Sequence, residues 1–322
     1  MVTPSKKIDF GEGRAAPPTI FSPVFGLLGL GLAWRSGVVA FDLPSNIAEI
    51  LLAAAILLYL FCVIAYLADV LRFPTRLGMD LKSVAGRAGL AVGSLSIFLL
   101  ALTAVPYSTS LATLLLVAGL ALHLAFALIV IYTLYSGRPE GRQPTPAWHV
   151  TFVGFIVAAP PAAALGMIGL AQGLFVAMVP VAVVIWVMSA RQLGRGSFPL
   201  ALRPMLAMHL APAALFAIVA AAIDLQFFAI GFAILTLALL TILMVAGRWL
   251  TAKGFTPLWS AFTFPLAASA SALLLQDGMK LFEVVGLWVL VAATVIIPLI
   301  LALVFRQWTK GQLSAISNNE PV

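Results

Sequence analysis

Charge is scarce in this 322-residue sequence: Asp, Glu, Lys and Arg together make up 9% of it, whereas hydrophobic residues make up 63%. A soluble globular chain carries about 25% charged residues, so the composition excludes a soluble protein. The sequence also lacks room for a separate soluble domain. Ten bilayer-spanning helices of about 20 residues use about 200 residues, and the remainder suffices only for short loops and two tails.

The residues of common catalytic and metal sites are also few. The single cysteine, Cys62, lies within a Leu-rich run, so no internal disulfide can form and no Cys/His metal spacing exists. The three histidines, His123, His149 and His209, show no ligand spacing such as i, i+4. No carboxylate pair lies within a hydrophobic run, and no Ser-His-Asp arrangement or phosphate-binding glycine loop is evident. We therefore predict no metal, no cofactor and no enzymatic activity.

Positive charge is present, and its distribution is uneven. Of the 18 Lys and Arg residues, 16 fall in every second gap or tail between the hydrophobic runs; these are Lys6, Lys7, Arg14, Arg72, Arg76, Lys82, Arg87, Arg138, Arg142, Arg191, Arg195, Arg203, Arg248, Lys253, Arg306 and Lys310. The intervening gaps hold only Arg35 and Lys280. Cytoplasmic loops retain Lys and Arg, so we predict ten spans of the plasma (inner) membrane with both termini in the cytoplasm. The net charge of +7 then reflects membrane orientation and not nucleic-acid binding.

The hydrophobic runs divide the chain into a tail over residues 1–19, a ten-helix membrane domain over 20–305 and a second tail over 306–322. The predicted spans are 20–37, 46–71, 88–105, 109–135, 148–170, 172–190, 205–223, 227–246, 257–275 and 282–305. Their outside connections are very short, which requires neighbouring spans to be antiparallel. The sequence therefore predicts an all-α integral membrane protein built as five successive helical hairpins.

Helix breakers are concentrated in the odd-numbered spans, where they include Pro23, Gly26, Pro160, Pro212 and Pro265. A proline inside a helix frees the carbonyl four residues back, and such a group is tolerated at membrane depth only where protein, water or a cavity satisfies it. We therefore expect the odd spans to form an inner ring around a pore and the even spans to face lipid. The alternative is that these residues serve helix packing alone.

The middle thirds of the odd spans contain no Asp, Glu, Lys or Arg. Intramembrane charges are typical of proton relays, so a central relay is unsupported. What remains is a neutral pore, which can conduct without binding strongly and which a hydrophobic ring can gate. The candidate lining residues in these spans are Ser94, Ser96, Thr103, Phe155, Phe216, Thr263, Phe264 and Ser269.

The ninth span carries the sharpest local pattern, GFTPLWSAFTFP over residues 254–265. Phe262 and Phe264 are two residues apart, which is about 200° around a helix. Both rings therefore cannot face one lumen: one points inward while the other packs outward, or both serve packing.

Four motifs in this order resemble the tellurite-resistance/dicarboxylate transporter family, which includes bacterial TehA proteins, plant slow anion channels and yeast malate and sulfite transporters. WSAFTFP over 259–265 is similar to the family's ninth helix, and FGLLGLGLAW over 25–34 is similar to its first. Pro146-Ala-Trp followed by Val153-Gly154 resembles the fifth helix, and Leu202-Arg-Pro followed by Ala211-Pro212 resembles the seventh. The segment over 80–87, DLKSVAGR, departs from the family because it lacks a His-Pro pair.

The resemblance implies a homotrimer in which each subunit has its own uncharged anion pore. It also implies a gate formed by the ninth-helix phenylalanine that matches Phe264, with Phe262 as the second choice. The leading prediction is thus an anion channel or channel-like transporter that carries small anions across the lipid bilayer. The alternatives are a secondary transporter of C4-dicarboxylates, sulfite or tellurite-like oxyanions, and a non-transporting membrane scaffold, which would have no continuous lumen.

Overall fold

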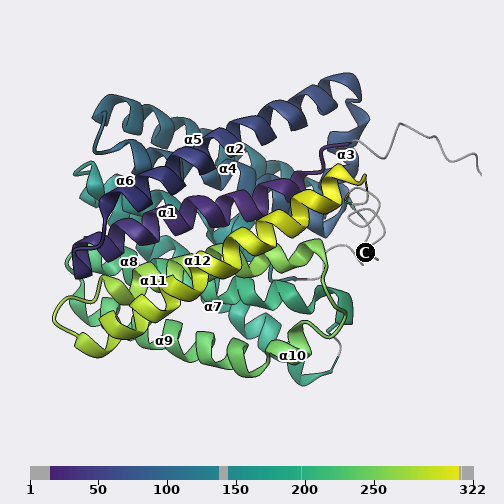
Figure 1. Cartoon of the computed structure of the whole chain (residues 1–322). Coiled ribbons are helices and arrows are strands. Elements are labelled where there is room, and N and C mark those ends of the chain that lie inside the picture. Colours follow the sequence, from purple (N-terminus) through teal and green to yellow (C-terminus); the bar gives the residue numbers. More distant parts are fainter. Residues whose placement is uncertain (1–14, 138–143, 197, 312, 314–322) are drawn as a thin grey trace, which may run out of the picture.

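The computed structural model of the chain describes residues 15–137, 144–196, 198–311 and 313, and all regular structure within these ranges is helical (Figure 1). The described chain begins and ends at the same end of the bundle, where the indole Nε1 of Trp308 donates to the carbonyl of Ala15 at 2.9 Å. We call this end the terminal face and the other end the opposite face. Five basic residues of the charge pattern lie outside the described residues: Lys6, Lys7, Arg14, Arg138 and Arg142.

Nine helices of the described chain are long and apolar enough to cross a membrane. Four of them belong to the odd spans: η2 (Pro18–Ile20) with α1 (Phe21–Phe41), α4 (Val84–Ala104), η6 (Leu200–His209) with α8 (Leu210–Ala222), and η7 (Pro257–Phe262) with α11 (Thr263–Leu274). The other five are α2 (Ser45–Arg72), α5 (Thr109–Ser136), α7 (Ile168–Gly194), α9 (Gln226–Val245) and α12 (Lys280–Thr309). Two short helices, α3 (Thr75–Lys82) and α10 (Gly247–Leu250), lie in connections at the terminal face.

The expected fifth span is shorter and less regular than the predicted 148–170. It consists of a π-helical turn, η4 (His149–Val153), a 3-10 turn, η5 (Gly154–Ala158), and α6 (Ala159–Ala164). It ends because Gly166 turns the chain with a φ of +77°, a conformation that glycine adopts freely. As an α-helix these residues would reach about 24 Å, which is less than the roughly 30 Å hydrocarbon core.

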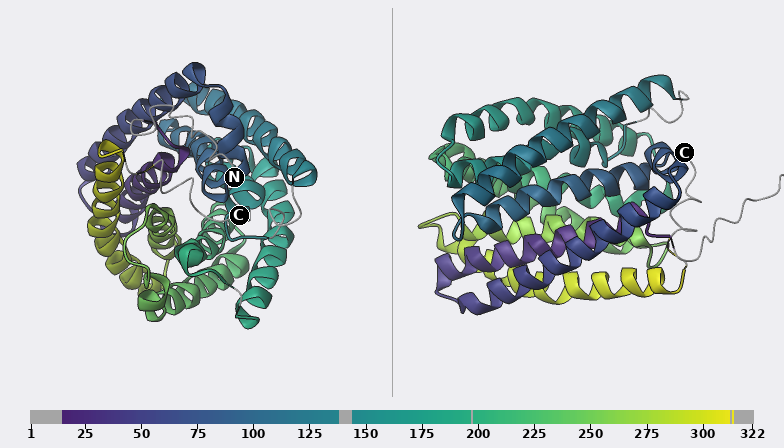
Figure 2. Two further views of the ribbon diagram at one scale, coloured as in Figure 1. Left: turned by 90° about the vertical axis from the view of Figure 1, so that its right-hand side faces the viewer. Right: turned by 90° about the horizontal axis from the view of Figure 1, so that it is seen from above.

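The helices form two concentric rings, which the end-on view in Figure 2 shows. In the most apolar stretch of each long helix, 56–83% of residues are buried for α1, α4, η6–α8 and η7–α11, but only 22–33% for α2, α5, α7, α9 and α12. The odd elements therefore form the inner ring, together with the short fifth segment, and the even helices form the outer ring. The apolar outer surface is the part of the molecule suited to lipid.

The sequence led us to expect prolines in the middle of the inner-ring α-helices. In the structure these prolines lie at the helix starts instead. Pro23, Pro212 and Pro265 are each the third residue of an α-helix, and Pro160 is the second residue of α6. The first turn of an α-helix is where the missing N–H of proline costs least. All four of these α-helices follow a 3-10 stretch, so each proline marks the junction at which the backbone changes from one helix type to the other.

Two glycines of α1 allow α11 to approach closely. A Cβ atom at Gly26 would lie 2.3 Å from the Cβ of Thr263, and one at Gly29 would lie 2.9 Å from Cδ2 of Phe264. No other residue type fits either position without movement. The α1–α11 contact thus fixes where the ninth-span phenylalanine lies.

Candidate functional site

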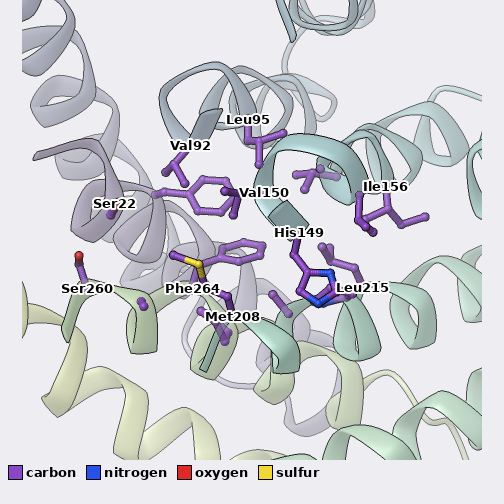
Figure 3. Close-up of a pocket in the computed structure, with 18 residues that line it drawn as sticks. Ser22, Val92, Leu95, His149, Val150, Ile156, Met208, Leu215, Ser260 and Phe264 are labelled. Carbon is purple, nitrogen blue, oxygen red and sulfur yellow. The ribbon is translucent and has the colours of Figure 1, made fainter. Parts of the chain in front are cut away.

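Two cavities lie within the inner ring, one on each side of Phe264. The terminal cavity has a volume of about 50 Å³ and is lined by residues near the starts of the inner segments, among them Ser22, His149, Met208 and Ser260 (Figure 3). The opposite cavity has a volume of about 310 Å³ and is lined by residues near their ends. Three side chains line both cavities: Val157, Leu215 and Phe264. These three form the partition between the two spaces.

The phenyl ring of Phe264 is held from two sides. It is 7% exposed and stacks on the ring of Phe25, with ring centroids 4.0 Å apart and planes 28° apart. The Cδ2–Cε2 edge of the ring lies against Gly29, where no side chain occupies the space. An apolar partition of this kind offers neither water nor an anion a hydrogen bond.

Phe262 lies elsewhere, as the spacing of the two phenylalanines requires. Its ring packs edge-on against Trp259, with centroids 6.2 Å apart and planes at 89°. Phe262 is absent from the residues that line either cavity. Of the two rings, only that of Phe264 reaches the axis of the bundle.

The terminal cavity is almost entirely apolar, and His149 is its one ionisable lining residue among the described residues. His149 is 3% exposed, and its Nε2 lies 2.8 Å from Nδ1 of His209. The two rings are perpendicular, and the carbonyl of His209 accepts a hydrogen bond of 3.1 Å from Nε1 of Trp186. The pair joins η4 to η6, whose histidines are 60 residues apart in the chain.

The opposite cavity contains one cation, Arg35, which is bound by a carboxylate. Its Nε and Nη2 donate to the two carboxylate oxygens of Glu49 at 2.8 and 2.9 Å, and its Nη1 donates to the carbonyl of Thr103 at 3.2 Å. The hydroxyl of Tyr107 donates to Glu49 at 2.6 Å. This hydrogen bond raises the pKa of the Tyr107 phenol above its ordinary value, because ionisation would remove the proton that Glu49 accepts. The cavity mouth is therefore close to electrically neutral.

A third histidine supports the irregular fifth segment from outside the inner ring. His123 of α5 is fully buried, with Nε2 at 3.1 Å from the carbonyl of Thr151 and Nδ1 at 2.8 Å from Oγ of Ser94. A Cβ atom at Gly154 would lie 2.9 Å from Nε2 of His123, so glycine is needed for this approach. The imidazole thus satisfies a polar group of the π-helical turn at membrane depth.

The structure distributes the residues proposed from the sequence over several places. Four of them line a cavity: Phe264, Pro160, Pro212 and Pro265. The others lie in helix contacts away from both cavities. Ser94 and Phe155 both contact His123, and Phe216 lies in an aromatic cluster with Phe175 and Phe232. In the contact between α1 and α11, Gly26 meets Thr263, and Pro23 is buried in α1. The remaining three donate to the carbonyl four residues back: Ser96, Thr103 and Ser269.

Sequence reasoning missed several residues of the site: Phe25, Val157, Leu215, Arg35 and the His149–His209 pair. Phe25 lies within a motif that the sequence did single out, so its position opposite the ninth span was a usable signal. Val157 and Leu215 are ordinary apolar residues in apolar segments, and nothing distinguishes them before the fold is known. The two histidines each lie near the start of an odd span, which hinted at a common depth but not at contact.

A family model described as voltage-dependent anion channel matches residues 15–305 of the chain. No curated protein sequence matches the chain significantly.

Proposed function

The chain belongs to the voltage-dependent anion channel family, and from this premise we propose that it conducts small anions along the axis of its own inner ring, through the two cavities. The observation that carries this proposal is the shared lining of those cavities by Phe264. A ring that borders both spaces is the element whose movement joins them. The arrangement described here is then the closed state of the path.

The gate consists of Phe264 and the side chains that hold it in place. Phe25 stacks on one face of the ring, while Val157 and Leu215 complete the partition. Rotation of the Phe264 side chain away from the axis would leave an opening bordered by small and aliphatic groups. A dry apolar constriction of this kind stops ions by excluding water, and removing the ring lowers that barrier.

The path supports conduction that is not coupled to protons. No Asp, Glu, Lys or Arg is found among the described residues that line the terminal cavity, and its one ionisable lining residue, His149, is bonded to His209. The Arg that lines the opposite cavity is already paired with Glu49. A coupled carrier usually has a carboxylate or another charge on its route. The chain is therefore best described as an anion channel or channel-like transporter.

The alternative is a secondary transporter of C4-dicarboxylates, sulfite or tellurite-like oxyanions. One observation favours it: the guanidinium of Arg35 holds a carboxylate with two parallel hydrogen bonds in the wall of the larger cavity. That geometry suits a carboxylate or oxyanion substrate as well as Glu49. A requirement for a pH gradient, with loss of flux in the presence of a protonophore, would support this alternative.

The gate is tested by paired substitutions in liposomes that contain the purified protein. Phe264→Ala is expected to raise chloride and nitrate flux on the order of tenfold, which corresponds to a barrier lower by about 1.4 kcal/mol. Phe262→Ala, two residues away and outside both cavities, is the matched control and should leave flux per reconstituted protein unchanged. Equal flux in all three proteins would place the gate elsewhere, and an increase with Phe262→Ala alone would reverse the assignment.

A further inference from the structure

The paired histidines beside the terminal cavity have two ring nitrogens without a hydrogen-bond partner. Nε2 of His149 and Nδ1 of His209 are bound to each other. Nδ1 of His149 and Nε2 of His209 are buried, and neither has a partner among the described residues. A buried polar atom without a partner is costly, so each calls for a ligand or another explanation. His149 is the member of the pair that lines the cavity.

The protons of the pair are linked through the bond that the rings share. A neutral imidazole carries one N–H, and its other nitrogen accepts. When His209 donates through Nδ1, Nδ1 of His149 must carry a proton and Nε2 of His209 must be bare. When His149 donates through Nε2, both outer nitrogens change role. A third proton would place an N–H on both outer nitrogens and give the pair a charge of +1.

The described elements packed against the pair contain no carboxylate that would bind such an N–H. The elements packed against the pair are α4, α5, α7, α8, α10, η5 and η7. Their described ionisable side chains other than His123 are Arg87, Arg191, Arg248, Tyr132 and Tyr135, to which η6 adds Arg203. Arg87 donates to the carbonyls of Leu81 and Lys82, and Arg203 stacks on Trp249. Both nitrogens of His123 already have partners. Trp186 lies 5.8 Å from the His149 ring, centroid to centroid, and is neutral.

The cavity provides the space that a small ligand needs. Its volume of about 50 Å³ exceeds the roughly 10–15 Å³ required for one water molecule. The hydroxyl of Ser260 already donates to the carbonyl of Pro257 at 2.6 Å, whereas Ser22 brings a second hydroxyl to the lining. An N–H of His149 would therefore be the principal donor to an anion in a space that is otherwise apolar.

We infer that the terminal cavity is a binding site for a small inorganic anion, held by Nδ1–H of His149 in the tautomer in which His209 donates to His149. The inference rests on the proposed function, since it identifies where a permeating anion pauses before the gate. Binding selects the tautomer with Nδ1–H on His149 and needs no net proton uptake. A proton added to the pair strengthens binding, because both outer nitrogens then donate and the pair is positively charged.

Nitrogen-15 NMR of the full chain in nanodiscs, labelled at histidine, tests this inference, because the sequence contains only three histidines. Addition of chloride or nitrate, with gluconate keeping the ionic strength constant, should move the signal of His149 Nδ1 towards the protonated form and that of His209 Nε2 towards the bare form. His123 should not respond, because both of its nitrogens are already bound. Lower pH should tighten chloride binding.

His149→Leu should weaken chloride binding about three- to tenfold, the loss expected for one hydrogen bond, and should remove its pH dependence. Phe262→Leu, outside the lining of both cavities, is the control and should bind chloride as the unmodified protein does. Signals of His149 and His209 that ignore chloride and nitrate, or that move no more than that of His123, would overturn the inference. Since binding is measured without flux, chloride-dependent signals in a protein that conducts nothing would instead count against the proposed function.

Discussion

At the scale of single residues, the position of Phe264 depends on a glycine as much as on an aromatic partner. Gly29 leaves the space in which the edge of the ring lies, and Phe25 covers its face. The ring is therefore confined by contacts that a single added carbon atom would change. Three residues earlier, Gly26 meets the Cβ of Thr263, an atom next to the backbone that cannot move on its own.

This difference predicts opposite outcomes for two similar substitutions. Gly29→Ala should push the ring of Phe264 off its position at a cost of about 0.5–1 kcal/mol, and should raise anion flux about two- to fivefold with little loss of stability. Flux in liposomes and the thermal midpoint in detergent measure the two effects. A flux that is unchanged in a well-folded Gly29→Ala protein would mean that the ring does not limit conduction.

Gly26→Ala is the control on the same helix. Its added methyl group meets Thr263 with no flexible side chain to yield, so it should cost about 1–3 kcal/mol of stability. It should lower Tm and expression without raising the flux of the protein that does fold. An open pore in Gly26→Ala would show that helix separation, and not ring displacement, opens the path.

At the scale of elements, α2, α3 and α4 together bury a carboxyl group whose ionisation burial disfavours. Asp80 at the end of α3 accepts a hydrogen bond of 3.0 Å from the hydroxyl of Tyr66. Burial raises the pKa of Asp80 to about 6, although Tyr66 and Arg76 oppose the shift and Asp69 adds to it. Asp69 itself is bonded to Arg76. A carboxyl group that folding makes harder to ionise weakens the fold at neutral pH.

The pH dependence of stability follows from this shift. In the unfolded chain Asp80 ionises near its ordinary pKa of 3.8, and in the folded protein near 6. Its contribution to stability is fully present below about pH 4 and is lost as the pH rises through 6. Asp80→Asn, which keeps an acceptor for Tyr66, should therefore raise Tm at pH 7.5 by about 2–4 °C, and the gain should shrink at pH 5.

Thermal unfolding of the two proteins at both pH values in one detergent checks this prediction. Asp224→Asn is the matched control: it makes the same chemical change at the opposite face, where Asp224 has a φ of +59° that Asn also tolerates, and should not alter Tm. A gain for Asp80→Asn that is equal at pH 5 and pH 7.5 would contradict the assignment of the effect to ionisation.

The elements also show how far the sequence could predict this fold. Hydropathy located the long helices to within a few residues, because burial in lipid demands about 20 apolar residues whatever the neighbours are. It failed at the fifth segment, where 148–170 was expected and the regular structure ends at Ala164. The π turn there depends on His123, a residue of another helix, which no local pattern can reveal. The prolines were correctly associated with irregular backbone, but their place in the first turn of each α-helix depends on 3-10 stretches that hydropathy does not distinguish.

The candidate site was predictable only in part for the same reason. Helix geometry alone predicts that Phe262 and Phe264 face different directions, and the choice of Phe264 came from the family resemblance. The contact between His149 and His209 depends on how two inner segments lie side by side, and that information is absent from the spacing of the residues.

At the scale of the whole molecule, the distribution of charge predicts the orientation in the membrane. Eleven basic side chains of the described chain lie at the terminal face, which is also where its two ends meet, and they include Arg72, Arg191, Arg248 and Arg306. Arg35 and Lys280 lie towards the opposite face. The positive-inside rule therefore predicts that the terminal face is cytoplasmic. A reporter fused after Val322 should score as cytoplasmic, and one inserted at the Asp277–Gly278 turn as external; the reverse pair would refute this orientation.

The assembly is expected to be a trimer, on the strength of the family resemblance. The outer ring exposes large apolar side chains along its length, for example Leu57, Leu128 and Trp288, and such a surface suits either lipid or a second copy. Cross-linking in membranes followed by mass measurement in mild detergent should give a species of three chains. A single chain of 34.0 kDa under both conditions would contradict the expectation.

The thinness of the partition at Phe264 has an electrical consequence. A cavity that fills with electrolyte supports little voltage. If the larger, opposite cavity fills, the potential across the bilayer would fall over the remaining apolar part of the path, which includes Phe264, Val157 and Leu215, and not over the whole of the roughly 30 Å of hydrocarbon. A potential of 100 mV is worth about 2.3 kcal/mol for one elementary charge, and an anion would experience most of it within this apolar part of the path. The apolar layer at Phe264 would therefore concentrate the electric field. Current through a partly open path should depend steeply on voltage.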